Sequence, residues 1–155
     1  HKGDTAIDIG PGMGYFTIPL AKLVGDAGRV TAIDIQTKML AALVAHAQKK
    51  GVSDRIKTHL ASPDSIGFHE KADFILACWM MHEVPDQQRL LSEIRDLMKS
   101  QGLFLLVEPL MHVSRNNFSH TIEMAKKLGF LIKEYPQIRM SQSALLTIGN
   151  NARRE

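Results

Sequence analysis

The chain has a single cysteine, no long apolar run and little excess charge, and each shortage excludes something. Cys78 stands alone, so an internal disulfide is impossible and a reducing compartment is expected. No apolar stretch approaches the roughly 18 residues of a membrane span, and no signal peptide is present, so we expect a cytoplasmic protein. Repeats, linkers and low-complexity segments are lacking too. We therefore expect one domain over residues 1–155.

Charge of one sign does not accumulate anywhere in the sequence. The formal net charge is +3, and the basic residues are scattered rather than clustered. The pairs Lys49–Lys50 and Lys126–Lys127 lie at predicted helix ends, where cations complement the helix dipole. We interpret them as solvated surface, so a nucleic acid is not the expected partner. An apolar content of 45% is ordinary for a globular protein.

What the chain does have is a strand followed by glycines at alternate positions. The apolar run Thr5–Ile9 is short and bounded by turn residues, which predicts a buried strand. Gly10, Gly12 and Gly14 follow, and a helical pattern comes next over residues 15–24. Glycine permits a tight turn and a close approach of the backbone to a ligand. A strand, a glycine turn and a helix N-terminus together indicate a nucleotide-type site.

The spacing of the glycines distinguishes between nucleotides. In the dinucleotide fingerprint G-x-G-x-x-G the third glycine would stand at Tyr15. Here it comes one residue early, at Gly14, and Asp8 stands two residues before the first glycine. A carboxylate beside the turn favours a ligand with a cationic amino group over one with a pyrophosphate. The pattern Asp8-x-Gly10-x-Gly12-x-Gly14 resembles motif I of the class I, seven-strand S-adenosylmethionine-dependent methyltransferases.

That resemblance extends to about residue 149 and implies a cofactor site. In the family the acid and glycines of motif I hold the amino-acid end of S-adenosylmethionine. Asp34, at the end of the second predicted strand, is assigned to the ribose diol, because one carboxylate can accept two hydrogen bonds. A solvated acid is the alternative. Ile35 and Met39 are assigned to an apolar wall for adenine, with a plain core role as the alternative for Met39. The family usually has an acid after the third strand, where this chain has Ser62.

The order of predicted elements is a repeated alternation of strand and helix. We expect an α/β fold: a doubly wound, mostly parallel seven-stranded sheet with helices on both faces. The last two strands are joined by few residues and should form a C-terminal antiparallel hairpin. Thr37 and Asp86 are expected to cap helices, and Gly102 to end one. Strands are predicted at residues 5–9, 29–34, 55–60, 72–78, 103–107, 130–135 and 144–148.

The segment Cys78–Asp86 resembles the family's segment after the fourth strand, which lines the methyl-donor site. Within it His82 is a candidate general base, with wall of the cofactor pocket as the alternative. Glu83 is the second catalytic candidate. A metal site with His112 is disfavoured, because two ligands would be adjacent in sequence and no standard zinc spacing is present. We therefore predict no metal.

Substrate class is read from the same region. The Asn/Asp-Pro-Pro-aromatic motif of amino-methylating DNA enzymes is absent. Cytosine-C5 methylation would require a cysteine nucleophile after a proline, whereas Cys78 follows Ala77 within an apolar strand. The stretch from Met81 to Pro109 looks most like the small-molecule branch called type 11, which includes quinone-biosynthesis C-methyltransferases. We expect a small-molecule methyl acceptor with an O, N or C nucleophile.

Two further hypotheses are kept beside the active methyltransferase. One is a non-catalytic binding module that retains the fold, and the other is an NAD-type dinucleotide-binding oxidoreductase. The first predicted strand begins almost at His1, so we expect the N-terminal cap helix of the family to be absent. The resemblance assigns the cofactor to Asp8, Gly10, Pro11, Gly12, Gly14, Tyr15, Phe16, Asp34, Ile35, Met39, Ala61, Ser62, Pro63, Cys78, Trp79 and His82.

Overall fold

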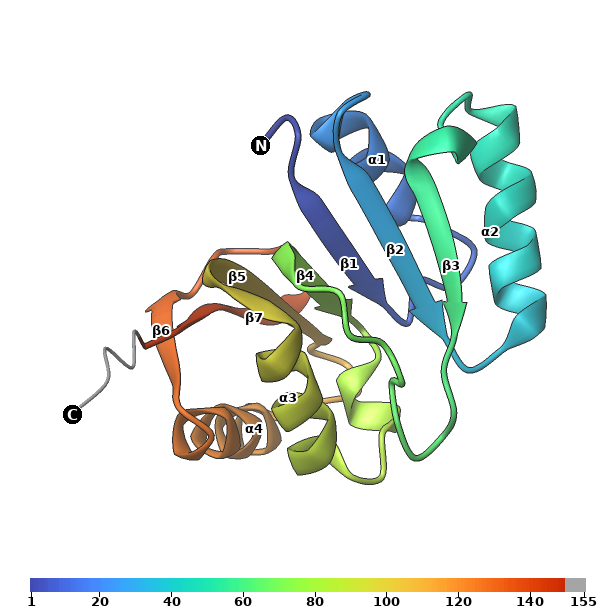
Figure 1. The fold of residues 1–155 in the computed structure, drawn as a ribbon. Helices are drawn as coiled ribbons and strands as arrows, with labels where there is room; N and C mark the ends of the chain where they lie inside the picture. Colours follow the sequence, from blue (N-terminus) through green and yellow to red (C-terminus); the bar gives the residue numbers. More distant parts are fainter. Residues whose placement is uncertain (150–155) are drawn as a thin grey trace.

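The computed structural model describes residues 1–149, which form a seven-stranded sheet with helices on both faces (Figure 1). Residues 150–155 of the predicted domain lie outside the described part. The strands are β1 (Thr5–Ile9), β2 (Arg29–Asp34), β3 (Ile56–Leu60), β4 (Ala72–Cys78), β5 (Met98–Pro109), β6 (Phe130–Glu134) and β7 (Ser141–Ile148). The helices are α1 (Thr17–Val24), α2 (Thr37–Lys49), α3 (Gln87–Leu97) and α4 (Arg115–Lys127), with short turns of 3-10 helix at η1 (Ser53–Arg55) and η2 (Met81–Glu83).

The strand order is β3-β2-β1-β4-β5-β7-β6, and only β7 runs against its neighbours. This confirms the predicted doubly wound sheet with an antiparallel hairpin at its end. The strand order reverses between β1 and β4, where Ile7 lies opposite Ile75. In open sheets of this kind ligands bind outside the carboxyl ends of the strands at such a reversal.

Each face of the sheet has its own core. Ile7 and Ile9 of β1 point into the larger core, which α3 and α4 cover with residues such as Leu91 and Phe118. Ala6, which directly precedes Ile7, packs on the other face with Ala21 of α1 and its neighbours. The alternation follows from the period of two along a strand. None of the described helices is long and apolar enough to cross a bilayer.

Several boundaries follow the sequence prediction and others do not. The bounds of β1, β2 and β4 are as predicted, and Asp86 caps α3 by accepting the N–H of Arg89 at 2.9 Å. Thr37 was expected to be a cap, but it is the first helical residue of α2, and Gln36 precedes it without a side-chain cap. The expected helix end at Gly102 is wrong.

Gly102 lies inside β5, because α3 already ends at Leu97. A Cβ at Gly102 would stand 2.9 Å from the carbonyl oxygen of Lys99 and 3.0 Å from that of Ala72. The lack of a side chain at Gly102 therefore allows β4 and β5 to approach closely, at the point where the register between them shifts. Likewise β7 begins at Ser141 rather than at residue 144, because Ser141 pairs with the last residue of β5.

Candidate functional site

The glycine turn after β1 forms one edge of the site. Gly10, Gly12 and Gly14 have φ angles of 67°, 53° and 91°, in the left-handed region that favours glycine. A Cβ at Gly10 would lie 2.9 Å from the side chain of Met80, whereas a Cβ at Gly12 would meet nothing within 4 Å. The turn at Gly12 therefore presents bare backbone to open space, and a ligand can approach it closely.

A cavity of about 620 Å³ opens beside this turn at the carboxyl ends of β1, β2 and β4. This volume lies in the range of about 300–1,000 Å³ that is typical of small-molecule sites. The cavity is bounded by the glycine turn, the segments after β2 and β3, and the loop from the end of β4 to α3. Its lining residues are Ile9, Gly10, Gly12, Ile33, Asp34, Ile35, Gln36, Met39, Ala61, Ser62, Pro63, Asp64, Ser65, Ile66, Trp79, Met80, Glu83, Val84, Pro85, Asp86, Arg89 and Leu90.

Asp34 is the one carboxylate in this lining that is almost fully buried. It ends β2 and is 9% exposed. Its Oδ1 accepts the N–H of Gln36 at 2.9 Å, and no described residue donates to Oδ2. Oδ2 is thus a free hydrogen-bond acceptor at the cavity. Ile35 is 56% exposed and Met39 is half-buried, so an apolar pair adjoins the free carboxylate oxygen.

The loop after β3 forms the opposite side of the cavity and is held by α3. Ser62 and Ser65 close a small turn, in which the Ser62 hydroxyl donates to the Ser65 carbonyl at 3.2 Å. The lone pairs of the Ser62 hydroxyl therefore remain available to a donor. Arg89 of α3 donates to the carbonyl of Pro63 at 2.9 Å, and Glu93 accepts the N–H of Ile66. Ala61, Ser62 and Pro63 all line the cavity, as the sequence predicted.

Asp8 lies beneath the glycine turn and does not line the cavity. It is 2% exposed, and its Oδ2 accepts the hydroxyl of Thr17 at 2.6 Å. Burial raises the pKa of Asp8 to about 7, the hydrogen bond from Thr17 opposes the rise, and the nearby Asp34 adds to it. A cation bound near the turn would favour the ionised form of Asp8.

Six more of the predicted cofactor residues do not line the cavity, namely Pro11, Gly14, Tyr15, Phe16, Cys78 and His82. Pro11 is buried, and Gly14 packs so closely on α2 that a Cβ there would lie 3.1 Å from Leu43. Tyr15 is 83% exposed. Phe16 points into a separate apolar groove, described next.

This apolar groove of about 210 Å³ lies over β4 and β5 beside α1. It also contains Cys78, so Cys78 and Phe16 line the same groove and neither lines the main cavity. Burial, with Asp8 and Glu108 nearby, raises the pKa of the Cys78 thiol to about 12, so the thiol stays protonated at neutral pH. Such a cysteine is not a nucleophile. The groove is lined by Phe16, Pro19, Leu20, Leu23, Phe74, Leu76, Cys78, Leu105, Val107 and Ile138.

His82 and Glu83 lie in the η2 turn, just after β4. Glu83 is exposed and lines the cavity. His82 lies between Met80 and Glu83 in the sequence but does not line the cavity, and its Nδ1 lies 2.8 Å from Oε2 of Glu108. The ring of His112 meets the His82 ring edge-on, with centroids 5.8 Å apart. Within residues 1–149 no three His, Cys, Asp or Glu side chains form a group that could hold a metal ion.

Trp79 connects the cavity wall to β7. It directly follows β4 and has a φ of 58°, a left-handed conformation that is unusual for a bulky residue and is often found at functional sites. Its indole N–H donates to the hydroxyl of Ser141 at 3.0 Å, and 53% of the residue is exposed. The indole is therefore held in place although half of it faces solvent.

Sequence reasoning missed two features of this site. One is the pairing of Glu108 with His82, and the other is the contact of Met80 with the glycine turn. Glu108 directly follows an apolar strand, and an acid in that position indicates a buried carboxylate with a structural or functional role. Met80 has no comparable signal, because only the fold brings it against Gly10.

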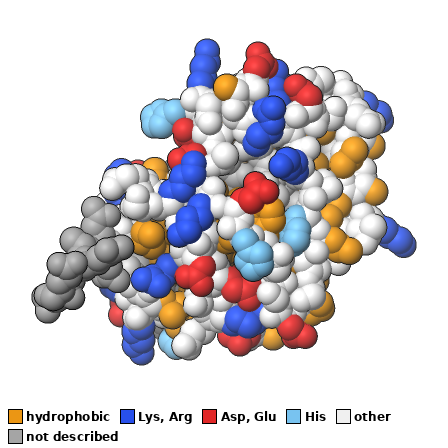
Figure 2. All heavy atoms as spheres, in the orientation of Figure 1, with side chains coloured by type: hydrophobic (Ala, Val, Ile, Leu, Met, Phe, Trp, Pro, Cys, Tyr) orange, Lys and Arg blue, Asp and Glu red, His pale blue; other side chains and the backbone are white. Residues whose placement is uncertain are grey.

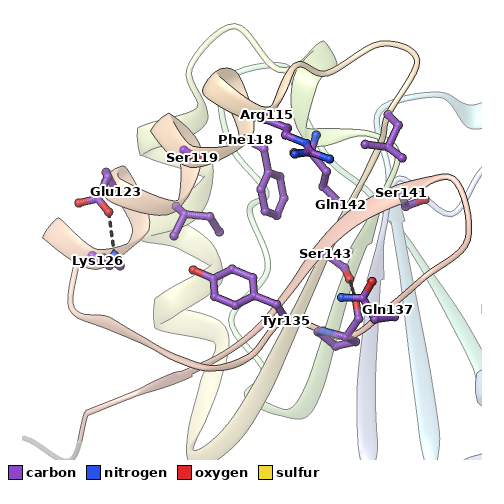
Figure 3. Close-up of a pocket in the computed structure, with 13 residues that line it drawn as sticks. Arg115, Phe118, Ser119, Glu123, Lys126, Tyr135, Gln137, Ser141, Gln142 and Ser143 are labelled. Atoms are coloured by element: carbon purple, nitrogen blue, oxygen red, sulfur yellow. Dashed lines mark hydrogen bonds and ion pairs between the residues drawn. The ribbon is translucent and has the colours of Figure 1, made fainter.

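A second cavity, of about 490 Å³, lies between α4 and residues 135–143 and shares no lining residue with the first (Figure 3). Phe118 and Ile122 form its buried floor, and Glu123 and Lys126 make an ion pair at 2.7 Å along its rim. It has no glycine turn and no buried carboxylate. The glycine turn and the buried carboxylate therefore belong to the first cavity alone.

Comparison with known proteins agrees with this architecture. A family model described as a methyltransferase domain matches residues 1–152. A crystal structure of a SAM-dependent methyltransferase from Aquifex aeolicus shares the fold, with a TM-score of 0.84 at 19% identity over 96% of this chain and 84% of that one.

Two curated relatives are more similar in sequence. The ubiquinone/menaquinone biosynthesis C-methyltransferase of Enterobacter sp. (strain 638) is 27% identical over 109 residues, which cover 70% of this chain and 43% of that protein. The demethylmenaquinone methyltransferase of Staphylococcus aureus (strain JH9) is 29% identical over 109 residues, covering 70% and 44%. The match spans less than half the length of these relatives. With the family model matching nearly end to end, the chain belongs to the class I S-adenosylmethionine-dependent methyltransferase domains.

Proposed function

We propose that this chain binds S-adenosylmethionine in the 620 Å³ cavity and transfers its methyl group to a small molecule. One observation carries the proposal: a bare glycine turn, a buried carboxylate with a free oxygen and an apolar pair line the same cavity. These three features suit the three parts of the cofactor, which are a charged amino acid, a ribose diol and an adenine ring.

Different residues of the chain would contact different parts of the cofactor. The turn at Gly10 and Gly12 would hold the amino-acid end, with Asp8 beneath it as the countercharge to the amino group. Oδ2 of Asp34 would accept from the ribose. Ile35 and Met39 would flank the adenine, with the loop from Ala61 to Pro63 on the other side. Trp79 and Glu83 would then lie toward the sulfonium end.

The bound cofactor supplies a methyl group that is already strongly electrophilic. The protein therefore has to orient the nucleophile, exclude water and, for a protonated nucleophile, remove a proton. His82 is the proposed base, because it directly precedes Glu83, which lines the cavity. Glu83 faces the cavity and would favour a positive charge there. The roles of both residues are part of the proposal.

A small molecule is the proposed methyl acceptor. The names of the two curated relatives refer to quinones, which supports an acceptor of that size. On the face shown in Figure 2, Lys and Arg side chains are interspersed with Asp and Glu, and this mixture does not favour the phosphate backbone of a nucleic acid.

Calorimetric titration with S-adenosylhomocysteine tests the proposal, with NAD as the parallel control. We expect micromolar binding of the former and none of the latter. Binding of NAD alone would overturn the proposal. Binding of S-adenosylhomocysteine without methylation of any small molecule offered with S-adenosylmethionine would favour a non-catalytic binding module.

A further inference from the structure

The second cavity, of about 490 Å³, runs along the length of α4. Its lining residues on this helix recur at intervals of three, four or one, so they share one face of α4. They are Arg115, Phe118, Ser119, Ile122, Glu123 and Lys126. The first and the last are eleven residues apart, which at the rise of an α-helix spans about 16 Å. A molecule that fills the cavity is therefore elongated.

The middle of the cavity is apolar. Phe118 and Ile122 are 6% and 3% exposed, and both belong to the core that α4 covers. Tyr135, after β6, is 53% exposed, and Figure 3 shows its ring reaching toward α4. Covering these side chains releases free energy only if the molecule that covers them is itself apolar or aromatic. The body of a ligand in this cavity is therefore apolar.

One cation of the lining has no counter-ion. Lys126 is paired with Glu123 at 2.7 Å, whereas no described residue makes a hydrogen bond or an ion pair with the guanidinium of Arg115. A guanidinium binds a carboxylate through two parallel hydrogen bonds. Its single charge balances one carboxylate, but only part of the charge of about −2 on a phosphate group. The lining therefore favours a ligand with one carboxylate.

We propose that this cavity binds an elongated apolar or aromatic carboxylate, with the acid group on Arg115 and the body over Phe118 and Ile122. The plainer explanation is a solvated crevice, in which Arg115 is unpaired because it faces water. The two explanations differ in their preference between an acid and a neutral molecule of the same shape. A crevice binds the neutral molecule at least as tightly, whereas the proposed site prefers the acid.

The acid end of this cavity lies near the proposed base. Gln142 lines the cavity, and its Nε2 donates at 2.9 Å to the carbonyl of Val113, two residues before Arg115. Gln142 is also paired with Glu108 of β5, and side chains of paired residues share a face of the sheet, with Cβ atoms about 5 Å apart. Glu108 in turn is bonded to His82. An occupant in this place is the methyl acceptor, with its nucleophile near the acid group, and this assignment rests on the proposed function.

Calorimetric titration of the cofactor-free protein with octanoate tests the site, with octanol as the neutral probe of the same shape. We expect the wild type to bind octanoate at least about tenfold more tightly, because a hydrogen bond to a charged group contributes that much. Arg115→Met removes the charge from a side chain of similar length and should abolish the preference. Arg139→Met is the matched control, since Arg139 is exposed but does not line the cavity, and it should keep the preference.

A second pair of variants tests where the body of the ligand lies. Ser119 and Asn116 are both exposed on α4, but only Ser119 lines the cavity. In Ser119→Phe the new ring would fill the space of the ligand body, so binding of octanoate should weaken by about tenfold or more. Asn116→Phe should bind as the wild type does, and thermal unfolding checks that both variants fold.

Three results would overturn the proposed site. They are a wild type that binds octanol as tightly as octanoate, a preference for the acid that survives in Arg115→Met, and unchanged binding in Ser119→Phe. Binding in the apolar groove beside α1 would give the last of these results, because that groove shares no lining residue with the second cavity.

Kinetics and NMR test the assignment to the methyl acceptor. With any acceptor that the wild type turns over, octanoate should raise the KM of the acceptor and leave kcat unchanged. Octanoate should also shift the imidazole NMR signals of His82 and leave those of His59, on the edge strand β3, in place. A lower kcat at unchanged KM, or signals of His82 that do not move, would overturn the assignment.

Failure of this inference can be told apart from failure of the proposed function. If the wild type binds no S-adenosylhomocysteine, the proposed function fails, while the titrations with octanoate and octanol still decide whether the second cavity is a carboxylate site. If the wild type binds S-adenosylhomocysteine and shows no preference for octanoate, only the inference fails.

Discussion

The carboxyl edge of the sheet has two halves that are built in different ways. The half at β1 and β2 presents backbone to the cavity, with a glycine turn and one carboxylate that lie within a short stretch of sequence. The half at β4 and β5 is made of side chains held by distant partners: His82 by Glu108, and Trp79 by Ser141. The first half depends on conformations that only certain residues adopt, whereas the second depends on the alignment of strands. We therefore expect substitutions to impair binding in the first half and turnover in the second.

The largest effect is expected from His82→Ala in the second half. Loss of a general base should lower kcat about 10²–10⁴-fold for a methyl acceptor that must lose a proton. Affinity for S-adenosylhomocysteine, measured by calorimetry, should hardly change. His120→Ala is the matched control, because His120 is exposed on α4 and does not line the cavity. Undiminished methylation by His82→Ala would mean that His82 has no catalytic role. It would also contradict the expectation that the second half of the edge governs turnover.

In the first half, Gly10→Ala should weaken cofactor binding by about 2–4 kcal/mol. The φ of 67° strains any side chain, and the new Cβ would clash with Met80. Gly51→Ala is a close control, since Gly51 has the same φ but nothing within 4 Å. Gly51→Ala should lower stability by about 1 kcal/mol and leave the affinity for S-adenosylhomocysteine unchanged. Equal affinities in the two variants would show that the turn at Gly10 is not part of the binding site.

Asp34→Ala should weaken binding of S-adenosylhomocysteine by about 1.5–3 kcal/mol, the range for hydrogen bonds to charged groups. The measurement is calorimetric titration, with Asp96→Ala on the exposed side of α3 as the control. If the affinity does not change, Asp34 does not bind the ribose. A loss in kcat without a loss in affinity would also contradict the division between the halves.

The smallest effect concerns Asp8 and is seen in stability. The pKa of Asp8 is raised from 3.8 to about 7 in the folded state, so the folded chain holds a proton that the unfolded chain has lost between these pH values. Its contribution to stability therefore falls as pH rises from about 4 to 7. Asp8→Asn removes this titration, and its stability relative to wild type should rise by on the order of 1–3 kcal/mol from pH 5 to pH 8.

Urea unfolding of the two proteins at both pH values checks the prediction for Asp8. Taking the difference between variant and wild type cancels the other titrating groups that the two chains share. A difference that is the same at pH 5 and pH 8 would mean that Asp8 is not a buried, proton-holding carboxyl in the folded protein.

The first half of the edge could be read from sequence because its information is local. The run Thr5–Ile9 and the glycines after it predict a strand, a turn and a ligand, and the structure places Gly10, Gly12 and Asp34 on one cavity. Their binding roles remain predictions. Local patterns also gave the bounds of β4, because an apolar run with turn residues around it has few other interpretations.

The second half could not be read in this way. The pairing of His82 with Glu108 depends on the register of β4 against β5, in which Cys78 lies opposite Val107, and no local pattern specifies that register. Cys78 shows a related limit. The period of two predicts that Cys78 shares a face with Leu76, but which face carries the ligand depends on the packing of α1. Gly102 was misread as a helix end because a close approach of strands also requires glycine.

Trp79 is an intrinsic fluorescent probe of the cavity. It is the only tryptophan in the chain, it lines the cavity beside the glycine turn, and its indole N–H is anchored to Ser141. All tryptophan emission from the folded protein therefore comes from this one wall. Because half of the residue faces solvent, a ligand that covers it should shift that emission. Occupancy of the cavity, and the rate at which it fills, should be readable from the fluorescence of the unlabelled protein.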